Sequence, residues 1–335
     1  MTKESVLIIG SSSFAGASMV DFLISKKKYN VYGTYRRKKN KAYLPYFKNS
    51  RKIKFKNIIV DFAKNPKKLI NVILKFKPRY IIDFASICMV NQSWENPETY
   101  ININILYKSF LLRNLKKFKF LKKYIYISTP EIFGSSKLIK ENCNIYNPST
   151  PYATSKLCFE MLLKNFAKNF NAPIIIARFS NFFGPGQPLY RLIPKLITCI
   201  DNEIKFPLEG KGQSKRNYIF SYDFCNGIHK IMSEGKIKNI YHFSGSEDYK
   251  TTDIIKILCQ LKSYNFKKLI KITKRRAGQD LNYKLDCKKT KKELNWQPLY
   301  PFKKALKLVI DYQKAVSKQI RKESLKYIDN QLRQE

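Results

Sequence analysis

Over the first half of the chain, short apolar runs alternate with longer stretches in which apolar residues recur at roughly every third or fourth position. The short runs predict β-strands, which we expect at residues 6–9, 31–35, 58–60, 80–84, 124–128 and 174–177. The longer stretches predict helices at residues 14–25, 66–76, 98–115 and 152–169. Strands and helices that alternate in this way are typical of an α/β fold with a doubly wound parallel sheet.

After about residue 180 this pattern gives way to stretches rich in glycine, proline and aromatic residues, such as "NFFGPGQPLYRLIP" and "FPLEGKGQSKRNYIF". We therefore expect residues 1–180 to form the sheet domain, with segments near residues 218–245 returning to it. Residues 181–315 are expected to form a smaller region that covers a ligand. Residues 316–335 are expected to form a polar, helical surface tail.

The stretch "VLIIGSSSFAGASMV" contains the first predicted strand, a turn of small residues and a helix start. Gly10 and Gly16 are the outer glycines of a G-x-x-G-x-x-G pattern, with Ser13 at the middle place. Such a turn lets backbone amides and a helix N-terminus approach a pyrophosphate. Its place after the first strand predicts a Rossmann-type dinucleotide site that includes Ser12 and Phe14.

The end of the second predicted strand decides which dinucleotide fits. An NAD site usually offers an acidic residue there, but this chain has Tyr35 followed by Arg36 and Arg37. Arginine suits a 2′-phosphate, which favours NADP over NAD, although both residues also fit as two further cations of a very basic chain. Asp61, after the third strand, is placed to meet the adenine.

Tyr152 and Lys156 are the candidate catalytic pair. The spacing Y-x-x-x-K occurs at Tyr35, Tyr152, Tyr264 and Tyr300, and in a lysine-rich chain it means little alone. Only Tyr152 lies on an amphipathic helical pattern and follows a strand that ends in Ser128 and Thr129. A neighbouring ammonium lowers the pKa of a phenol, so Tyr152 can act as a base, while Thr129 or Ser128 binds the hydroxyl being oxidised.

Over nearly its whole length, the sequence resembles the extended short-chain dehydrogenase/reductase family, in the branch of nucleotide-sugar epimerases and dehydratases. The resemblance rests on the stretches "GSSSFAG", "IIDFAS", "NINIL", "YISTPEIFG", "PYATSK", "RFSNFFGPGQ", "KRNYIFSYDF", "RRAGQDLNYKLD" and "LNWQP". It implies further cofactor contacts at Phe62, Phe84, Ala85, Ser86 and Asn104. It also implies nucleotide-sugar contacts at Ser93, Arg178, Asn181, Arg216 and Arg276.

Within this branch the chain is most similar to the 4,6-dehydratases of dTDP-glucose and GDP-mannose. The resemblance implies that Tyr152 takes the C4 hydroxyl proton, a hydride leaves C4, Glu131 removes the C5 proton and water leaves C6. Enzymes acting on dTDP-glucose usually carry aspartate, the acid for the departing hydroxyl, where this chain has Pro130. We interpret Glu131 as serving both C5 and C6, with Pro130 stiffening the turn that aims it. Pro130 also fits as a plain turn residue of an enzyme that never dehydrates.

Other functions remain open on this sequence. A 4-epimerase, a decarboxylase and a 4-keto reductase of the same family share the Tyr152 and Lys156 pair. A 4-epimerase has no use for a base at C5, and a decarboxylase needs a cation that no arginine near residues 86–93 supplies. A catalytically idle RNA-binding protein on the same fold is disfavoured by the intact Thr129, Tyr152 and Lys156.

The composition narrows the remaining classes. The formal net charge is +41, but the lysines are spread over every segment, so compositional drift explains them better than specific nucleic-acid binding. The seven cysteines form no C-x-x-C pair, and we expect neither a disulfide framework nor a metal site. No run reaches the ~18 apolar residues of a membrane helix, and the N-terminus lacks a signal-peptide pattern, so we expect a cytoplasmic protein. The resemblance further implies a homodimer formed by the helices at 98–115 and 152–169.

Overall fold

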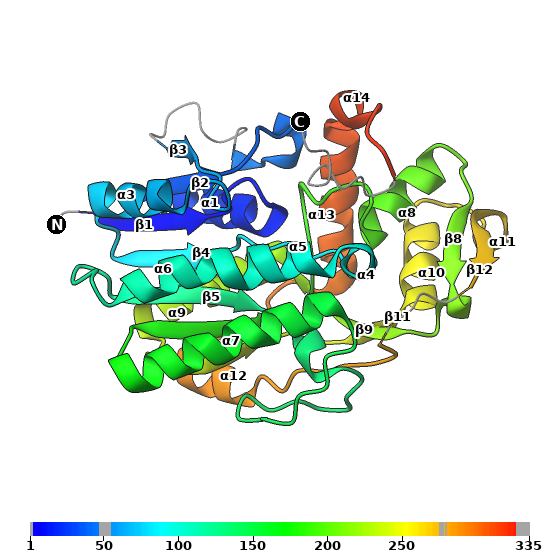
Figure 1. Ribbon diagram of the computed structural model, residues 1–335. Helices are drawn as coiled ribbons and strands as arrows, with labels where there is room; N and C mark the ends of the chain where they lie inside the picture. Colours follow the sequence, from blue (N-terminus) through cyan, green and yellow to red (C-terminus); the bar gives the residue numbers. More distant parts are fainter. Residues whose placement is uncertain (1–2, 47–54, 275–277, 279, 326–335) are drawn as a thin grey trace.

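A parallel sheet forms the centre of the computed structural model, which describes residues 3–46, 55–274, 278 and 280–325 (Figure 1). In the described part it has seven strands in the order β10-β6-β5-β4-β1-β2-β3. Their bounds are β1 (Glu4–Ile9), β2 (Tyr29–Tyr35), β3 (Lys56–Ile59), β4 (Tyr80–Asp83), β5 (Lys123–Ser128), β6 (Ile174–Phe179) and β10 (Ile240–Phe243). The predicted α/β fold with a Rossmann-type doubly wound sheet is confirmed.

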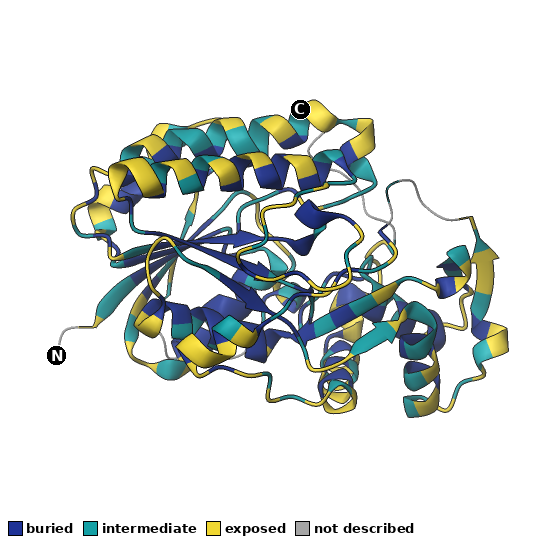
Figure 2. Cartoon of the chain, turned by 90° about the horizontal axis from the view of Figure 1, so that it is seen from below, coloured by how far each residue is buried: buried dark blue, intermediate teal, exposed yellow. Residues whose placement is uncertain are grey.

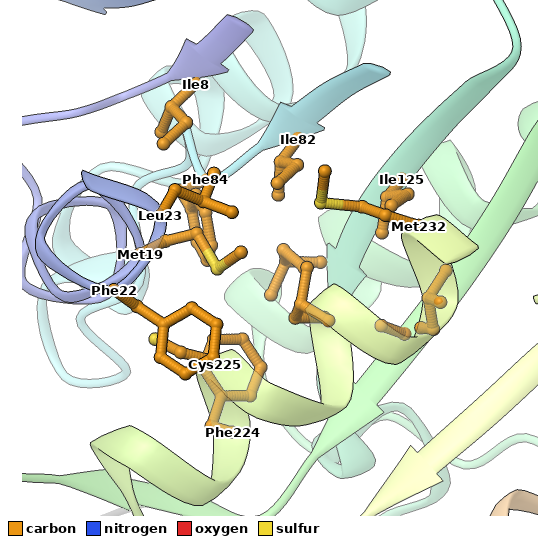
Figure 3. Packing of buried hydrophobic residues seen from close by; sticks show 14 of the residues in the cluster. Ile8, Met19, Phe22, Leu23, Ile82, Phe84, Ile125, Phe224, Cys225 and Met232 are labelled. Atoms are coloured by element: carbon orange, nitrogen blue, oxygen red, sulfur yellow. The ribbon is translucent and has the colours of Figure 1, made fainter. Parts of the chain in front are cut away.

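Helices cover both faces of this sheet. One face packs against α1 (Phe14–Lys26), α9 (Ser221–Glu234) and α12 (Lys288–Leu294), and Figure 3 shows the cluster between α1, α9 and the strands. The other face packs against α3 (Pro66–Phe76), α6 (Tyr107–Leu115) and α7 (Pro151–Phe170). The inner strands β1, β4, β5 and β6 are mostly dark blue in Figure 2 because a parallel sheet covered on both sides is buried there, whereas the edge strand β3 has no buried residue. This burial explains why the strands appear in the sequence as continuous apolar runs.

The helix predicted at residues 98–115 is interrupted. It consists of α5 (Pro97–Ile101), a π-helical turn η3 (Asn102–Leu106) and α6. Asn104 in this turn is fully buried, so a polar side chain enters the interior at the point where the helical hydrogen-bond pattern changes. Such π-turns are frequent at functional sites.

A second region lies beyond the carboxyl ends of the main strands (Figure 1). It contains a three-stranded sheet of β11 (Asp248–Lys250), β9 (Lys215–Phe220) and β7 (Asn181–Phe183), and a two-stranded sheet of β12 (Ile270–Thr273) and β8 (Phe206–Glu209). Its core involves α8 (Leu192–Asp201), α10 (Thr251–Leu261) and α13 (Phe302–Ala315), beside which lies α11 (Phe266–Leu269). The described short helices that complete the chain are η1 (Lys41–Tyr43), α4 (Gln92–Glu95), η4 (Pro130–Phe133), η5 (Gly210–Gly212) and α14 (Ser317–Ile320).

Two sequence expectations need correction here. Residues 215–220 do not return to the main sheet, because β9 pairs with β7 and β11; only β10 joins that sheet, beside β6. The segment that begins at residue 316 is not a purely polar tail, because Val316 and Ile320 are buried against Ala42 and Leu189. Residues 326–335 lie outside the described residues. None of the described helices combines the length and apolar character needed to cross a membrane.

Candidate active site

The turn after β1 is packed too tightly for side chains at its glycines. Gly10 has a φ of 83°, and a Cβ there would lie 3.0 Å from the amide nitrogen of Ala85. A Cβ on Gly16 would lie 2.2 Å from the carbonyl oxygen of Gly10. Ser13 caps α1, because its Oγ accepts a hydrogen bond from the Gly16 amide at 3.1 Å. The turn therefore presents backbone amides and a helix N-terminus, as a dinucleotide diphosphate requires.

The other residues predicted around the cofactor lie at the carboxyl ends of β1, β2, β3 and β4. Ser12 is in the turn, and the Phe14 ring at the start of α1 lies 4.5 Å from the Phe182 ring. Tyr35 is the last residue of β2, and Arg36 and Arg37 follow directly. These positions fit the two ends of a dinucleotide laid across the strand ends.

Asp61 and Phe62 follow β3, and both have structural contacts of their own. One carboxylate oxygen of Asp61 accepts hydrogen bonds from the amides of Ala63 and Lys64, at 3.1 and 3.4 Å. Phe62 packs against the core cluster that contains α3 and α6. Asp61 therefore holds the turn after β3 and keeps its second carboxylate oxygen for other contacts.

The loop after β4 brings two corrections. The Phe84 side chain is 92% buried in the cluster shown in Figure 3, so only its backbone, which packs against Gly10, is left to face a cofactor. Asn104 accepts a hydrogen bond from the Ile87 amide at 3.0 Å and donates to the Ile87 carbonyl and to Ser155 Oγ. Its side-chain amide therefore connects the loop that contains Ala85 and Ser86 with α7.

Thr129, Glu131 and Tyr152 meet at the carboxyl end of β5. Thr129 caps the short helix η4, with Pro130 at its first position, and its Oγ1 accepts from the Glu131 amide at 3.3 Å. Proline is pre-organised for this position because its φ is already helical. The Thr129 side chain also hydrogen-bonds Tyr152, and the Glu131 carboxylate acts on the same phenol. The Thr129 hydroxyl, the Glu131 carboxylate and the Tyr152 phenol therefore lie close enough at this strand end to influence one another.

The pKa of Tyr152 differs from the sequence expectation. Burial raises the pKa of Tyr152 well above its ordinary value, and the charge of Glu131 raises it further. The groups that lower it are Thr129, through its hydrogen bond, and Arg191, through its charge. Lys156, which was expected to lower this pKa, donates instead to the Ile127 carbonyl and to Ser86 Oγ.

Lys156 is directed at the sheet and at the loop after β4. Its Nζ donates to the Ile127 carbonyl at 2.7 Å and to Ser86 Oγ at 3.1 Å. Burial lowers the pKa of Lys156 to about 7, and the charge of Lys108 contributes in the same direction. The lysine therefore titrates near neutral pH, far below the usual range of its side chain.

Ser128 and Arg178 belong to the interior rather than to the reacting centre. Ser128 Oγ donates to Glu160 Oε2 at 2.8 Å, and the same carboxylate forms an ion pair with Arg178 that is completely buried. Arg178 also contacts His242 Nε2 at 3.2 Å. Because Ser128 precedes Thr129 on a strand, its side chain points to the opposite side. Their predicted roles in catalysis and in substrate binding are therefore wrong in this structure.

This ion pair gives a stability prediction. Replacing Arg178 with methionine leaves the Glu160 charge buried with Lys164 as its remaining ionic partner, so we expect the free energy of unfolding to fall by ~3–5 kcal/mol. Urea denaturation measures the loss. A double variant, Glu160→Met with Arg178→Met, should recover most of it. Equal losses in the single and double variants would contradict this account.

The predicted sugar-nucleotide contacts are only partly brought together. Asn181 on β7 accepts a hydrogen bond from the Tyr283 hydroxyl at 3.2 Å, and the Arg216 guanidinium lies 4.4 Å from the centre of the Tyr283 ring. Ser93 is instead fully buried and donates to the Val90 carbonyl at 2.6 Å, so its predicted substrate contact is wrong. Arg276 lies outside the described residues.

Arg191 is a further residue of the site, and its local sequence fits a solvated surface cation equally well. Its Nη2 lies 3.1 Å from Sγ of Cys88, an exposed residue in the loop after β4, and its charge acts on Tyr152. The argument that no arginine serves residues 86–93 is therefore wrong. Arg191 lies more than a hundred positions away in sequence, and nothing in its local pattern indicates that it returns to this loop.

Comparison with known proteins agrees with this geometry. A family model described as GDP-mannose 4,6 dehydratase matches residues 7–309. The chain is 25% identical to dTDP-glucose 4,6-dehydratase of Haemophilus influenzae, over 92% of this chain and 97% of that one. A dTDP-D-glucose 4,6-dehydratase of Dictyostelium discoideum is 33% identical over 56% of this chain and 45% of its own length.

Solved structures share the fold. That of dTDP-glucose 4,6-dehydratase from Bacillus anthracis, in complex with NAD, has a TM-score of 0.84 at 23% identity and covers 94% of this chain and 98% of its own. That of UDP-glucuronic acid 4-epimerase from Bacillus cereus, in complex with UDP-glucuronic acid and NAD, has a TM-score of 0.85 at 23% identity and covers 93% and 99%. The fold alone therefore does not separate dehydration from epimerisation.

Proposed function

Because the chain belongs to the GDP-mannose 4,6-dehydratase family, we propose that it is a nucleotide-sugar 4,6-dehydratase. It converts a nucleoside-diphosphate hexose into the 4-keto-6-deoxy sugar and one water. The observation that carries this proposal is the meeting of Thr129, Glu131 and Tyr152 at one strand end. A carboxylate beside the catalytic phenol is what removal of a C5 proton requires, and simple oxidation or reduction at C4 does not need it.

The residues divide the reaction between them. Thr129 binds the C4 hydroxyl and Tyr152 takes its proton as C4 becomes a ketone; a cationic nicotinamide bound beside the phenol would lower its raised pKa and so allow it to act as a base. The ketone acidifies the C5 proton, which Glu131 removes as the C6 hydroxyl leaves. Glu131, now protonated, delivers that proton to the departing hydroxyl, so water forms without a second acid at the position of Pro130. When C6 has been reduced, C5 takes up the proton held by Tyr152, which completes the 4-keto-6-deoxy sugar and restores the base.

A nicotinamide cofactor fits the turn after β1, where a Cβ at either glycine would close the approach. When bound, it supplies the hydride acceptor at C4 and the hydride donor at C6, so it is retained unchanged through the cycle. Lys156 is positioned to hold the ribose, and Ser86 and Ala85 border the same space. The Bacillus anthracis dehydratase structure contains NAD, whereas Arg36 and Arg37 here favour NADP.

The two arginines make this preference testable. Charge-assisted hydrogen bonds contribute about 1.5–3 kcal/mol each, so replacing Arg36 and Arg37 together with alanine should weaken NADP binding by ~10²–10⁴-fold and leave NAD binding nearly unchanged. Calorimetric titration with both cofactors measures the ratio. Arg113→Ala, an exposed arginine on α6, is the control. An equal loss for both cofactors would show that the arginines do not read the 2′-phosphate.

The substrate is a nucleoside-diphosphate sugar. Arg216 and Asn181, which lie around Tyr283, are placed to bind its diphosphate, because a guanidinium offers two parallel donors to phosphate oxygens. Arg276 is proposed for the same role from the sequence. The Haemophilus influenzae and Dictyostelium discoideum relatives are named as dehydratases of dTDP-glucose, which makes this the first sugar to test.

Arg191 favours one second candidate, an enzyme acting on a uronic acid. A guanidinium beside Tyr152 suits a sugar carboxylate at C5, and the Bacillus cereus epimerase structure contains UDP-glucuronic acid. Such an enzyme would epimerise C4 or release carbon dioxide. Glu131 favours the dehydratase over this candidate, since neither epimerisation at C4 nor decarboxylation requires a base that removes the C5 proton.

Incubation of the purified protein with dTDP-glucose, GDP-mannose, UDP-glucose and UDP-glucuronic acid tests the proposal. We expect one neutral hexose derivative to lose ~18 Da, the mass of one water, without net consumption of added cofactor. An unchanged mass with altered stereochemistry would establish an epimerase, and a loss of ~44 Da from the uronic acid would establish a decarboxylase. Turnover of a keto-sugar only with stoichiometric NADPH would establish a reductase.

The proposal includes a cytoplasmic homodimer. Ile101 on α5, Leu106 on η3 and Met161 on α7 are exposed apolar residues of the predicted pairing helices. Analytical ultracentrifugation measures the oligomeric state directly, and Met161→Lys should shift a dimer toward the monomer.

A further inference from the structure

A buried ion pair, formed by Asp83 and Lys108, lies next to the catalytic lysine. Lys108 on α6 and Asp83 at the end of β4 are each 98% buried, and Lys108 Nζ lies 2.7 Å from Asp83 Oδ2. The Tyr124 hydroxyl donates to the same oxygen at 2.6 Å. Burying two charges costs free energy that their attraction does not generally return, so such a pair needs a reason beyond stability.

Asp83 holds the loop that borders the active site. Its Oδ1 accepts a hydrogen bond from the Ala85 amide at 2.9 Å. The next residue, Ser86, accepts from Lys156, and the backbone of residues 84–85 packs against Gly10. The carboxylate thus fixes both the turn toward the cofactor site and one partner of the catalytic lysine.

Lys108 shares an aromatic ring with Lys156. The Nζ of Lys108 lies 5.0 Å from the centre of the Tyr126 ring, and the Nζ of Lys156 lies 4.2 Å from the same centre. Tyr126 is completely buried, so little water lies between the two ammonium groups to screen them. Each cation therefore opposes the charging of the other.

We propose that the buried Asp83–Lys108 pair is a positioning and electrostatic device for Lys156: Asp83 fixes the loop that meets the lysine, and Lys108 limits the charge that the lysine carries. This inference rests on the proposed function, in which Lys156 serves the cofactor. The groups that face Lys156 are Lys108 from α6, Asp83 from β4, Ser86 and Cys88 from the following loop, Tyr126 from β5, and Tyr152 and Glu160 from its own helix.

The electrostatic effects on Lys156 have opposite signs. After burial, Lys108 is the largest influence lowering the pKa of Lys156, whereas Asp83, Cys88 and Glu160 raise it. Lys156 is therefore mostly charged below about pH 7 and loses its charge as the pH rises through that value. The pair thus places the charge change of Lys156 in the neutral range.

Two single substitutions separate this role from a structural one. In Lys108→Met the opposing charge is gone and Asp83 remains, so the pKa of Lys156 should rise by on the order of 0.5–1 unit. In Asp83→Asn the carboxylate that raises this pKa is gone, so the pKa should fall, but by less than it rises in Lys108→Met, because Lys108 has the larger effect. Both variants lose one charge of a buried pair, so both should unfold at lower urea concentration. A purely structural role predicts the common loss of stability without opposite pKa shifts.

The pKa is measured by 13C NMR on the full chain labelled at lysine Cε, following the resonance that Lys156→Met removes. Ordinary lysines titrate near pH 10.4, which leaves few signals moving near neutrality. If a single variant does not fold, the double variant Asp83→Asn with Lys108→Met carries no unpaired charge and should have a pKa above that of the unaltered protein. Shifts in the same direction in both single variants, or no shift in the double variant, would overturn the proposal.

The pKa that governs the pH dependence of kcat/KM, measured with the nucleotide sugar that proves active in the panel, should shift in the same direction as the pKa of Lys156 measured by NMR. The NMR titration needs no turnover, so it decides this inference even if the protein proves not to be a dehydratase. Absence of water loss with the predicted NMR shifts would reject the proposed function alone. Water loss without those shifts would reject the role of Lys108 alone.

Discussion

Replacing Glu131 with glutamine is expected to stop the loss of water, with a fall in kcat of ~10²–10⁴-fold, the usual contribution of a positioned acid or base. Glutamine keeps the size of the side chain and removes the carboxylate that takes the C5 proton. Because the Glu131 amide, not its side chain, donates to Thr129, the turn at Pro130 should be unchanged. Mass spectrometry of the sugar product measures the effect.

Glu141→Gln is the matched control for this variant. Glu141 is also a largely buried glutamate, but its carboxylate accepts from Thr290 away from the site, so activity should be retained. Full water loss in Glu131→Gln would show that another group removes the C5 proton. It would also leave Pro130 as a simple turn residue with no bearing on the reaction.

Replacing Tyr152 with phenylalanine is expected to lower kcat by ~10²–10⁴-fold for every nucleotide sugar, because all reactions of the site begin with proton transfer at C4. The variant loses only the hydroxyl and keeps the aromatic ring, whose centre lies 6.4 Å from the centre of the Tyr100 ring, so the fold should be preserved. Steady-state rates with the best sugar of the panel measure the loss.

Tyr264→Phe is the control for Tyr152→Phe, because Tyr264 also has a lysine four positions later but lies in the core of the second region. Its activity should match that of the unaltered protein. A Tyr152→Phe variant with near-normal kcat would contradict the assignment of the base and would direct attention to Glu131 for the first proton as well.

The main sheet could be predicted because a parallel sheet buries both faces of each strand. Runs such as residues 6–9 and 80–82 are apolar throughout and are completely or almost completely buried in the structure. The positions of Gly10, Thr129 and Tyr152 followed from the same logic, since the loops after parallel strands meet at one edge. Local pattern and fold agree at these points.

Contacts between distant segments could not be predicted. Ser128 and Thr129 look alike in sequence, and only the strand register sends Ser128 to Glu160 and Thr129 to Tyr152. Lys108 is one of many lysines until the fold encloses it beside Asp83. Arg191, which directly precedes α8, meets Cys88 of the loop after β4 only in the folded chain. The sequence contains the residues but no local signal for these three encounters.

The transfer of hydrogen within one sugar tests the central claim most directly. The active nucleotide sugar, deuterated at C4, is converted in ordinary water and the product is analysed by NMR and mass spectrometry. Dehydration as described here moves the deuterium to C6 and removes one water. Deuterium that remains at C4 in an epimer of unchanged mass, or a product that has lost carbon dioxide, would contradict the account.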